Sequence, residues 1–485
     1  MKINIDSKKL KKLHQMDPRT QSYNVEMTEV TGGTFWKAYT KAQIEGKEEF
    51  KASMDFLSMM DMYPPIDLTN KRLRVLAKAL GPAYIRVSGS WASGTYYDFE
   101  GKTNGQIPEG FTAVLTKEQW TSVLDFAKAV DARVVVSLAN TDGVHNKDGS
   151  WNQDQAKLLF DFSKDYGVAI SGAEFMNEPN VFEMSGAPKG YTPADFGRDQ
   201  DLFFRFIREN YPDTILAGPS ACADKFGTGP TVPMKSYSTE ELLSYCKENP
   251  DVFSYHLYYG ISERGAMMGG HRDVDDVLTE EYLSFTDVGY EYYAKIRDKH
   301  VPNADMWVTE TADAACGGNT WGSTFLDTFR YVDQMARFNK NTRGVLFHNT
   351  LTASDYGLLD TKTHLPRPNY WAALLWARLV GTQVYDTNEP IREGVHLYAH
   401  SRKDGKEGYV YILVNNSRTE KTILDIPVKS TRYTLSSNNL RSQEVLLNGK
   451  LLALENEYDI PQIKGIVEDK GLLEIEPLTI TFLVV

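Results

Sequence analysis

The stretch AKLLFDFSKDYGVAISGAEFMNEPN, residues 156–180, combines the two patterns that decide the fold. An amphipathic, helix-like segment leads after a short turn into an apolar run, 172–180, which ends in Asn177-Glu178-Pro179. A carboxylate at the end of a buried strand is costly unless something there pairs with it or uses it. The tripeptide therefore predicts either a simple turn that closes a strand or a functional site.

The same alternation of short apolar runs and longer amphipathic segments continues over about the first 380 residues. The runs that read as strands are 22–30, 83–89, 133–140, 172–180, 214–220, 252–259, 306–311 and 344–349. The segments with apolar residues at helical spacing include 69–80, 153–167 and 323–338. Strands that are each followed by a helix predict an α/β fold, a (β/α)₈ TIM barrel over residues 22–385.

The pattern changes after YWAALLWARLVGTQVY, residues 370–385. Short strand-like runs follow, joined by turns rich in Asn, Gly and Ser, and no long helix interrupts them. This indicates an antiparallel β-sandwich domain over residues 386–485. The N-terminal segment 1–21 contains INID, which we expect to add a strand to the sandwich.

Composition and charge narrow the function. The chain has 485 residues, and its 65 acidic side chains outnumber the 53 basic ones, which gives a net charge of −12. Such a chain repels phosphate backbones, so we expect no nucleic-acid partner. Three cysteines, Cys222, Cys246 and Cys316, are too few and too scattered for a disulfide or zinc framework.

The sequence predicts no membrane segment and no secretory signal. It contains no run of about 18 apolar residues, the length that a membrane-spanning helix needs. The basic cluster near the N-terminus is not followed by an apolar segment. We therefore expect a soluble, cytoplasmic protein, although a secreted chain whose signal had been removed would look the same.

Two glutamates follow apolar runs at positions that matter in a barrel. Glu178 ends the fourth predicted strand and Glu310 ends the seventh, and the carboxyl ends of the strands build the active site of this fold. Two carboxylates there suit glycosidic bond cleavage, with retention of configuration if they lie about 5–5.5 Å apart. A metal site and a structural ion pair are the alternatives. No His stands at a ligand-like spacing from either glutamate, so the sequence predicts neither a metal nor a cofactor.

Segments along nearly the whole chain carry a resemblance to one family. They are GPAYIRVSG (81–89), residues 156–180, SYHLYYG (254–260), ASDYGLLD (353–360), LPRPNYWAALLWARLVGTQVY (365–385) and EVLLNGKLLAL (444–454). Together they resemble the heparanase and β-glucuronidase family of retaining glycoside hydrolases, glycoside hydrolase family 79 of clan A. Asn-Glu-Pro is common to the clan, whereas the loop after strand eight and the sandwich hairpin narrow the resemblance to this family.

The resemblance implies roles for residues on four strands. It makes Glu178 the acid/base and Glu310 the nucleophile. Asn177 would bind the 2-hydroxyl of the sugar, a contact that tightens in the transition state. Arg86 and Tyr258 would keep Glu310 ionised and oriented, since a nearby cation favours the charged form. The structural alternative for Arg86 is an ion pair with another acid inside the barrel.

Further residues would bind the substrate. By the resemblance, Tyr356 and the N–H of Ser354 hold the carboxylate of a uronic acid, and Gly357 permits the turn. Glu29, at the expected end of strand one, looks like the family's acidic residue that binds sugar hydroxyls. His256 is either a packed core histidine or a sugar contact.

Two departures from the family bear on substrate binding. Asp355 is acidic where a neutral residue is common, and we expect it to point away from a substrate carboxylate. The segment 37–66 is an insertion longer than a strand-to-helix connection needs.

Three functions remain open at this point. The acidic chain and the insertion favour a retaining β-glucuronidase that acts on terminal glucuronides or short uronic-acid oligosaccharides. An endo-acting heparanase that cuts heparan sulfate is the alternative, and it needs basic residues along the cleft. A non-catalytic carbohydrate-binding barrel would usually lack one of the two carboxylates. The sequence leaves the oligomeric state open.

Overall fold

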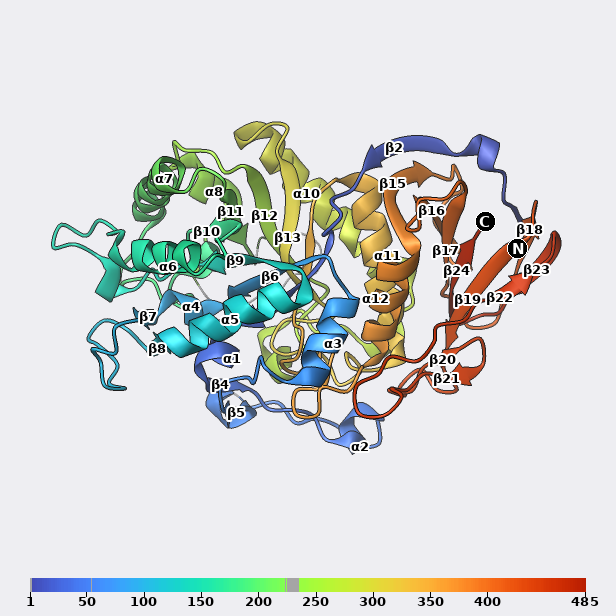
Figure 1. Cartoon of the computed structure of the whole chain (residues 1–485), viewed down its shortest axis with the longest axis horizontal. Coiled ribbons are helices and arrows are strands. Elements are labelled where there is room, and N and C mark those ends of the chain that lie inside the picture. The colour runs from blue at the N-terminus through green and yellow to red at the C-terminus, as the bar shows by residue number, and fades with distance from the viewer. Residues whose placement is uncertain (1, 54, 223, 225–234) are drawn as a thin grey trace.

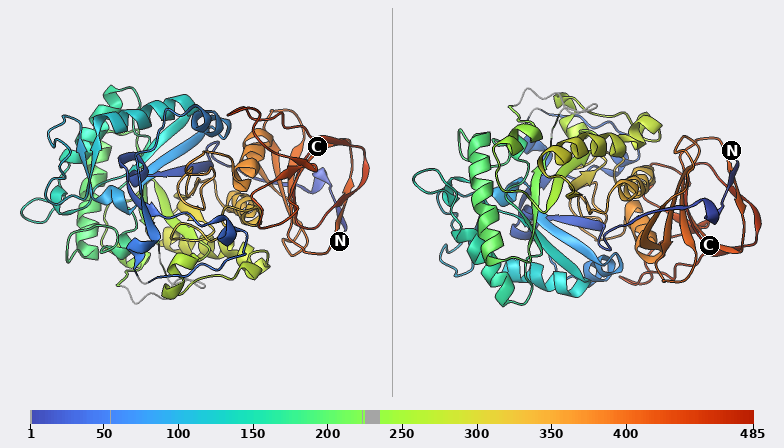
Figure 2. Two further views of the ribbon diagram at one scale, coloured as in Figure 1. Left: turned by 90° about the horizontal axis from the view of Figure 1, so that it is seen from below. Right: turned by 90° about the horizontal axis from the view of Figure 1, so that it is seen from above.

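The computed structural model describes residues 2–53, 55–222, 224 and 235–485, and it consists of a barrel joined to a sandwich (Figure 1). The barrel holds the blue-to-yellow part of the chain, and the sandwich holds most of the orange-to-red part. Two further views show the same side-by-side arrangement, with both chain termini on the sandwich (Figure 2).

Eight parallel strands close the barrel, which confirms the predicted TIM-barrel class. They are β3 (Gln21–Glu26), β6 (Ala83–Ser88), β9 (Ala132–Ser137), β10 (Gly172–Glu174), β11 (Ile215–Ala221), β12 (Val252–Tyr258), β13 (Asp305–Ala312) and β14 (Leu346–His348). Each overlaps one of the predicted runs, and they follow one another around the barrel in sequence order.

Two of the strand ends that differ from the prediction bear on the site. β3 stops at Glu26 because helix α1 (Met27–Thr31) begins there with a capping box, in which the side chains of Glu26 and Glu29 each accept from the other's backbone N–H. The expectation that Glu29 ends strand one is therefore wrong. β10 stops at Glu174, and Glu178 lies in the loop beyond it with a left-handed φ of 48°.

The longer helices surround the barrel. They are α3 (Lys71–Ala79), α5 (Lys117–Val130), α6 (Asp154–Asp165), α7 (Pro193–Asn210), α10 (Phe285–His300), α11 (Phe325–Asn341) and α12 (Pro368–Leu379). α11 and α12 lie between the barrel and the sandwich (Figure 1) and are buried along almost their whole length. Within the described ranges, no helix is both long enough and apolar enough to cross a membrane.

The sandwich has a nine-stranded and a three-stranded sheet. The larger contains β2 (Lys11–Gln15), β15 (Val380–Asp386), β16 (His396–Arg402), β17 (Tyr409–Asn415), β19 (Ser430–Ser436), β20 (Leu446–Leu447), β21 (Lys450–Leu451), β22 (Ile466–Glu468) and β24 (Thr479–Val484). The smaller contains β1 (Lys2–Asn4), β18 (Thr422–Ile426) and β23 (Gly471–Ile475). The N-terminal segment thus contributes one strand to each sheet, and β15 starts the larger sheet before the predicted boundary at residue 385.

The insertion after strand one is a hairpin with a long tip. Its arms, β4 (Gly33–Trp36) and β5 (Met60–Tyr63), pair antiparallel, and the tip includes the short helix α2 (Lys41–Ile44). The Tyr39 hydroxyl donates to the Gly318 carbonyl over 3.1 Å, and Arg441 of the sandwich donates to the Ile44 carbonyl over 2.7 Å. These contacts hold the hairpin over the carboxyl end of the barrel.

Candidate active site

The polar site begins halfway up the barrel. Tyr84, Arg86 and Ser88 alternate along β6 and point inward. Tyr84 packs with Trp307 and Phe347 in an apolar cluster that fills the amino-terminal end of the barrel. The next inward residue, Arg86, is fully buried, and it starts a layer of charged side chains above that cluster.

Arg86 of β6 donates hydrogen bonds to residues from the fourth and seventh predicted strands. Its Nε donates to Glu174 over 3.0 Å, its Nη1 to Glu310 over 3.0 Å and its Nη2 to Asn177 Oδ1 over 2.8 Å. Burial lowers the pKa of Arg86. The charges of Glu174 and Glu310 raise it by a larger amount, so the pKa lies above its ordinary value. Both interpretations of Arg86 hold, since it pairs with a barrel acid and also contacts the predicted nucleophile.

Glu174 is a site residue that the sequence reasoning missed. It is the last residue of β10 and is completely buried. Besides Arg86, its carboxylate accepts hydrogen bonds from the hydroxyls of Ser137 and Ser220. The available signal was a second glutamate inside the same apolar run, four residues before Glu178.

Glu310 lies on β13 with a hydrogen-bond donor at each oxygen. Arg86 reaches Oε1, and the Tyr258 hydroxyl donates to Oε2 over 2.7 Å. His256 of β12 is in register with Glu310, and its Nδ1 lies 3.5 Å from Glu310 Oε2. The structure therefore places Arg86 and Tyr258 beside Glu310, as the resemblance implies.

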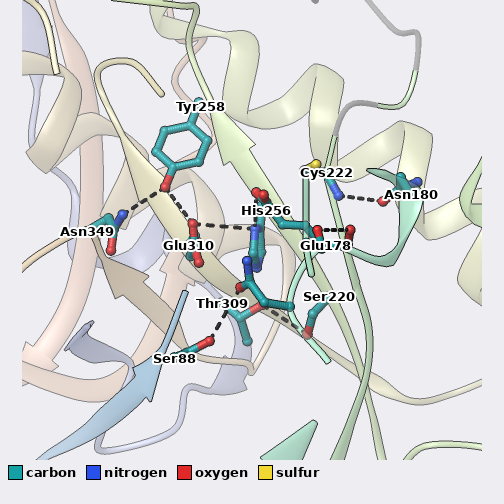
Figure 3. A network of polar contacts seen from close by, with 12 residues as sticks. Ser88, Glu178, Asn180, Ser220, Cys222, His256, Tyr258, Thr309, Glu310 and Asn349 are labelled. Carbon is teal, nitrogen blue, oxygen red and sulfur yellow. Dashed lines mark hydrogen bonds and ion pairs between the residues drawn. The ribbon is translucent and has the colours of Figure 1, made fainter. Parts of the chain in front are cut away.

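Glu178 faces Glu310 across His256 (Figure 3). His256 Nδ1 is 2.9 Å from Glu178 Oε1, and the ring is buried. Burial raises the pKa of Glu178, but the hydrogen bond to His256, the charge of that ring, the Cys222 thiol and Arg86 together hold the pKa below its ordinary value. His256 thus bridges the two carboxylates, a role that neither sequence alternative for it included.

The spacing of these groups bears on the chemistry. One ligand atom each of Glu178, His256 and Glu310 lies within 4.8 Å of the others. This is close to the separation of about 5–5.5 Å in retaining glycosidases and well below the 6.5–9.5 Å of inverting ones.

The same three atoms have a spacing at which a metal ion could bind. The sequence argument against a metal relied on spacing along the chain, and it fails here because the barrel brings His256 between the two glutamates. The Arg86 guanidinium 3.0 Å from Glu310 disfavours a cation at this place.

The loop after β14 connects to Tyr258 and Glu310 through one amide. Asn349 Nδ2 donates to the Tyr258 hydroxyl over 2.9 Å and to the Tyr356 hydroxyl over 3.2 Å. Its Oδ1 accepts from Asn24 of β3 over 3.0 Å. Tyr258 in turn donates to Glu310, so Tyr356 is two hydrogen bonds away from Tyr258 and three away from Glu310. Nothing in the sequence singled out Asn349 beyond its place at a strand end.

The other predicted residues of this loop shape it. Ser354 has a left-handed φ of 60°, and its hydroxyl donates to the Gly317 carbonyl over 2.8 Å. Among the residues that the structure describes, none accepts a hydrogen bond from the Ser354 N–H. Gly357 does not have a positive φ. A Cβ on Gly357 would lie 3.0 Å from the Leu359 carbonyl oxygen, so close backbone contact requires the glycine.

The charge of Asp355 is balanced by an ion pair inside the loop. Its Oδ2 accepts from Arg264 Nη2 over 2.6 Å and from the Tyr39 N–H over 3.3 Å. Both side chains of the ion pair are buried. The acid in the family motif is therefore matched by a cation from the loop after β12.

Glu26 takes the strand-end position that the sequence analysis gave to Glu29. The Glu29 carboxylate accepts from Thr352 Oγ1 over 2.6 Å and from the Glu26 N–H over 2.8 Å, and burial raises its pKa to about 7. Glu26 is more deeply buried, and burial followed by the charges of Glu310 and Glu29 raises its pKa well above the ordinary range. Glu26 thus lies close enough to Glu310 and Arg86 to interact with their charges, whereas Glu29 fastens α1 to the loop after β14.

A family profile decides the identity of the chain. The profile described as glycosyl hydrolase family 79, N-terminal domain, matches residues 56–336, which is more than half of the chain. The chain belongs to glycosyl hydrolase family 79. The predicted family is confirmed, and so is the prediction that the protein is a glycoside hydrolase.

Curated relatives of this family 79 chain align along most of their length. Heparanase-like protein 1 of Arabidopsis thaliana is 26% identical, with 86% of this chain and 84% of the relative covered. Baicalin-beta-D-glucuronidase of Scutellaria baicalensis is 26% identical, with coverage of 86% and 83%. Hyaluronoglucuronidase of Hirudo nipponia is 25% identical, with coverage of 90% and 93%.

Solved structures support the fold of the family 79 chain. A 4-O-alpha-L-rhamnosyl-beta-D-glucuronidase from Fusarium oxysporum superposes with a TM-score of 0.66 at 14% identity, and 100% of each chain is covered. A family 51 alpha-L-arabinofuranosidase from Thermotoga petrophila gives 0.63 at 14% identity, with 99% of each covered. Both likenesses concern the barrel-plus-sandwich architecture.

Proposed function

We propose that this family 79 enzyme is a retaining β-glucuronidase. The observation that carries the proposal is the pair of carboxylates, Glu178 and Glu310, whose nearest oxygens lie within 4.8 Å on either side of His256. Each has the surroundings that its role requires. Glu310 has fixed hydrogen-bond donors, and Glu178 has a partner with which it can share a proton.

Glu310 is the nucleophile. The Arg86 guanidinium donates to one of its oxygens, and the Tyr258 hydroxyl fixes the orientation of the other. Its attack on the anomeric carbon gives a covalent glycosyl-enzyme, while the leaving oxygen takes a proton from Glu178. Water then attacks the same carbon, and Glu178 accepts the proton of that water.

His256 shares the acid's proton. A general acid usually has a raised pKa, yet the pKa of Glu178 is lowered, and His256 is the main reason. We infer that the Glu178–His256 pair holds one proton along its 2.9 Å hydrogen bond and delivers it to the leaving oxygen through Glu178. Asn177, fixed by Arg86 at 2.8 Å, keeps its amide NH₂ for the 2-hydroxyl of the sugar.

The preference for a uronic acid rests on the loop after β14. The Tyr356 hydroxyl accepts from Asn349, which leaves its own proton for the substrate carboxylate. The Ser354 N–H supplies a second donor. The names of two relatives, a baicalin-beta-D-glucuronidase and a hyaluronoglucuronidase, support a glucuronide or a uronic-acid oligosaccharide as substrate. An endo-acting heparanase is the second candidate, because a heparanase of Bos taurus is 24% identical over 461 residues.

The test is chemical rescue of Glu310→Ala with an aryl β-glucuronide. The change leaves a space in which azide attacks from the nucleophile's face while Glu178 still protonates the leaving group. Turnover without azide should be lost, and added azide should give the α-glucuronyl azide. A β-azide, or near-normal turnover without azide, would remove Glu310 from its role.

A further inference from the structure

Glu174 is a buried carboxylate that the proposed mechanism does not use. It is the last residue of β10 and is completely buried, so it does not touch a bound sugar. It is nevertheless tied to the active site, because the Arg86 guanidinium that donates to Glu310 also donates to Glu174, through Nε over 3.0 Å and through Nη2. A buried charge is costly unless something pairs with it or uses it.

Serine hydroxyls from three strands surround the Glu174 carboxylate. Ser137 of β9 and Ser88 of β6 donate to Oε1, the latter over 3.3 Å, and Ser220 of β11 donates to Oε2. Neutral hydroxyls stabilise a carboxylate by hydrogen bonding, but they add no positive charge. The counter-charge of Glu174 therefore has to come from Arg86.

One cation serves two carboxylates at this depth of the barrel. Within the part of the chain that the structure describes, Arg86 is the only Lys or Arg that forms an ion pair with Glu174 or with Glu310. Burial lowers the pKa of Arg86, and the charge of Glu174 is the largest of the influences that raise it, ahead of the charge of Glu310. The two carboxylates thus compete for the positive charge of one guanidinium.

This competition bears on both steps of a double displacement. Hydrogen bonds between charged groups are the strong ones, so a guanidinium pulls electron density from the carboxylate that it contacts. That makes the carboxylate a weaker nucleophile and a better leaving group. Glu310 has to be both, because it attacks the anomeric carbon as the first leaving group departs, and it is itself displaced by water in the second step.

We propose that Glu174 is a positioning residue that divides the charge of Arg86 and thereby sets the balance between formation and hydrolysis of the glycosyl-enzyme. The inference rests on the proposed function and extends it to a residue that touches neither the substrate nor the reacting atoms. Glu174 acts on Glu310 through Arg86. By drawing part of the positive charge away, it favours the attack of Glu310 over its departure.

The experiment measures the two steps separately in Glu174→Gln, which removes the charge and keeps the shape. Formation is measured as kcat/KM on dinitrophenyl β-glucuronide. Hydrolysis is measured as the recovery of activity after the enzyme has been trapped with 2-deoxy-2-fluoro-β-glucuronyl fluoride. The fluoride released on trapping counts the active sites, so an unfolded fraction does not distort either rate.

We expect formation of the glycosyl-enzyme to slow about tenfold in Glu174→Gln, as when a partner behind a functional group is removed. Hydrolysis should not slow, because Arg86 then stabilises the departing Glu310 carboxylate with its whole charge. A purely structural role for Glu174 would slow both steps.

Two further variants separate charge from packing. Ser137→Ala removes a hydroxyl that donates to the same carboxylate and leaves the charges of Glu174, Arg86 and Glu310 in place, so the ratio of the two rates should not change. Glu174→Asp withdraws the charge from Arg86 by one methylene group. The ratio should move in the same direction as in Glu174→Gln but by less, and this variant carries the test if Glu174→Gln does not fold.

The outcomes distinguish this inference from the proposed function. Equal losses in both steps of Glu174→Gln would show that Glu174 only supports the barrel, and so would an unchanged ratio in Glu174→Asp if the other variant does not fold. The proposed function would stand in either case. The same change of ratio in Ser137→Ala would assign the effect to packing. A wild-type enzyme that neither cleaves the glucuronide nor is trapped at Glu310 would instead contradict the proposed function itself.

Discussion

The Asn349 side chain is hydrogen-bonded to two tyrosines with different proposed roles. Its amide donates to Tyr258, which holds the proposed nucleophile Glu310, and to Tyr356, which we propose binds the uronate. Burial raises the pKa of Tyr356 well above the ordinary range, and the charges of Glu26 and Glu310 raise it further. Tyr356 therefore keeps its proton, so it can donate to a carboxylate but not repel one.

Tyr356→Phe should cost the enzyme its preference for glucuronides. A hydrogen bond to a charged group contributes about 1.5–3 kcal/mol, so kcat/KM for an aryl β-glucuronide should fall about 10- to 150-fold. The matching aryl β-glucoside lacks the carboxylate and should change little. Steady-state kinetics on both sugars measures the difference.

The matched control for that variant is Tyr258→Phe. It removes the hydroxyl that donates to Glu310 over 2.7 Å, so both sugars should lose rate alike. If Tyr356→Phe also slows both sugars alike, Tyr356 supports Asn349 and the loop rather than the substrate carboxylate.

Sequence reasoning found residues that follow apolar runs and missed those defined by contacts across the barrel. Glu178, Glu310 and Arg86 stood out because a charge next to a strand is conspicuous. Asn349 and Glu174 acquire their importance only from partners on other strands. Glu29 was misplaced because a capping box and a strand end look alike in an apolar run.

A buried cation is one of the groups that fix the inserted hairpin. Arg264 Nη2 donates to Asp355 over 2.6 Å and to the Lys37 carbonyl over 2.6 Å. Its guanidinium lies 3.7 Å from the centre of the Tyr39 ring. The hairpin, the loop after β12 and the loop after β14 therefore meet at one side chain.

Arg264→Met should destabilise the protein by about 3–5 kcal/mol, because Asp355 is then buried without a counter-charge. Urea unfolding measures the loss. Adding Asp355→Asn to that variant removes the uncompensated charge and should recover part of the stability. Stability equal to wild type in the single variant would show that the pair does not hold the hairpin in place.

The elements themselves were largely predictable. Periodicity located all eight barrel strands because most parallel barrel strands are largely apolar. It could not reveal that residues 33–36 and 60–63 pair across a long insertion, since each arm has only four residues. It also ran β10 on to Glu178, because Phe175 and Met176 remain buried beyond the strand.

The barrel and the sandwich are joined by a buried charged network. His396 of β16 contacts Asp333 of α11 over 2.5 Å and Glu280 over 2.6 Å. Arg337 and Tyr398 also bind Asp333, each over 2.6 Å. Burial lowers the pKa of His396, but Asp333 and Glu280 outweigh it and raise the pKa to about 9. The charged imidazole is thus part of the interface.

Stability should therefore fall in alkaline solution. The pKa of His396 is about 9 in the folded protein against an ordinary 6.5. Its contribution is complete below pH 6.5 and is lost as the pH rises through 9, about 3 kcal/mol in all. Melting temperatures between pH 6 and pH 10 would follow the loss. His396→Gln should flatten this part of the profile, and the same alkaline loss in that variant would assign it to another group.

The stereochemistry of the first product tests the central claim most directly. The claim is that Glu178 and Glu310, with oxygens within 4.8 Å, cleave a β-glucuronide by double displacement. Proton NMR, recorded on an aryl β-glucuronide before the released sugar equilibrates, distinguishes the anomers. The account predicts that β-glucuronic acid appears first and the α-anomer grows in later by mutarotation. If the α-anomer appears first, the enzyme inverts, and the assignment of Glu310 as a nucleophile is wrong.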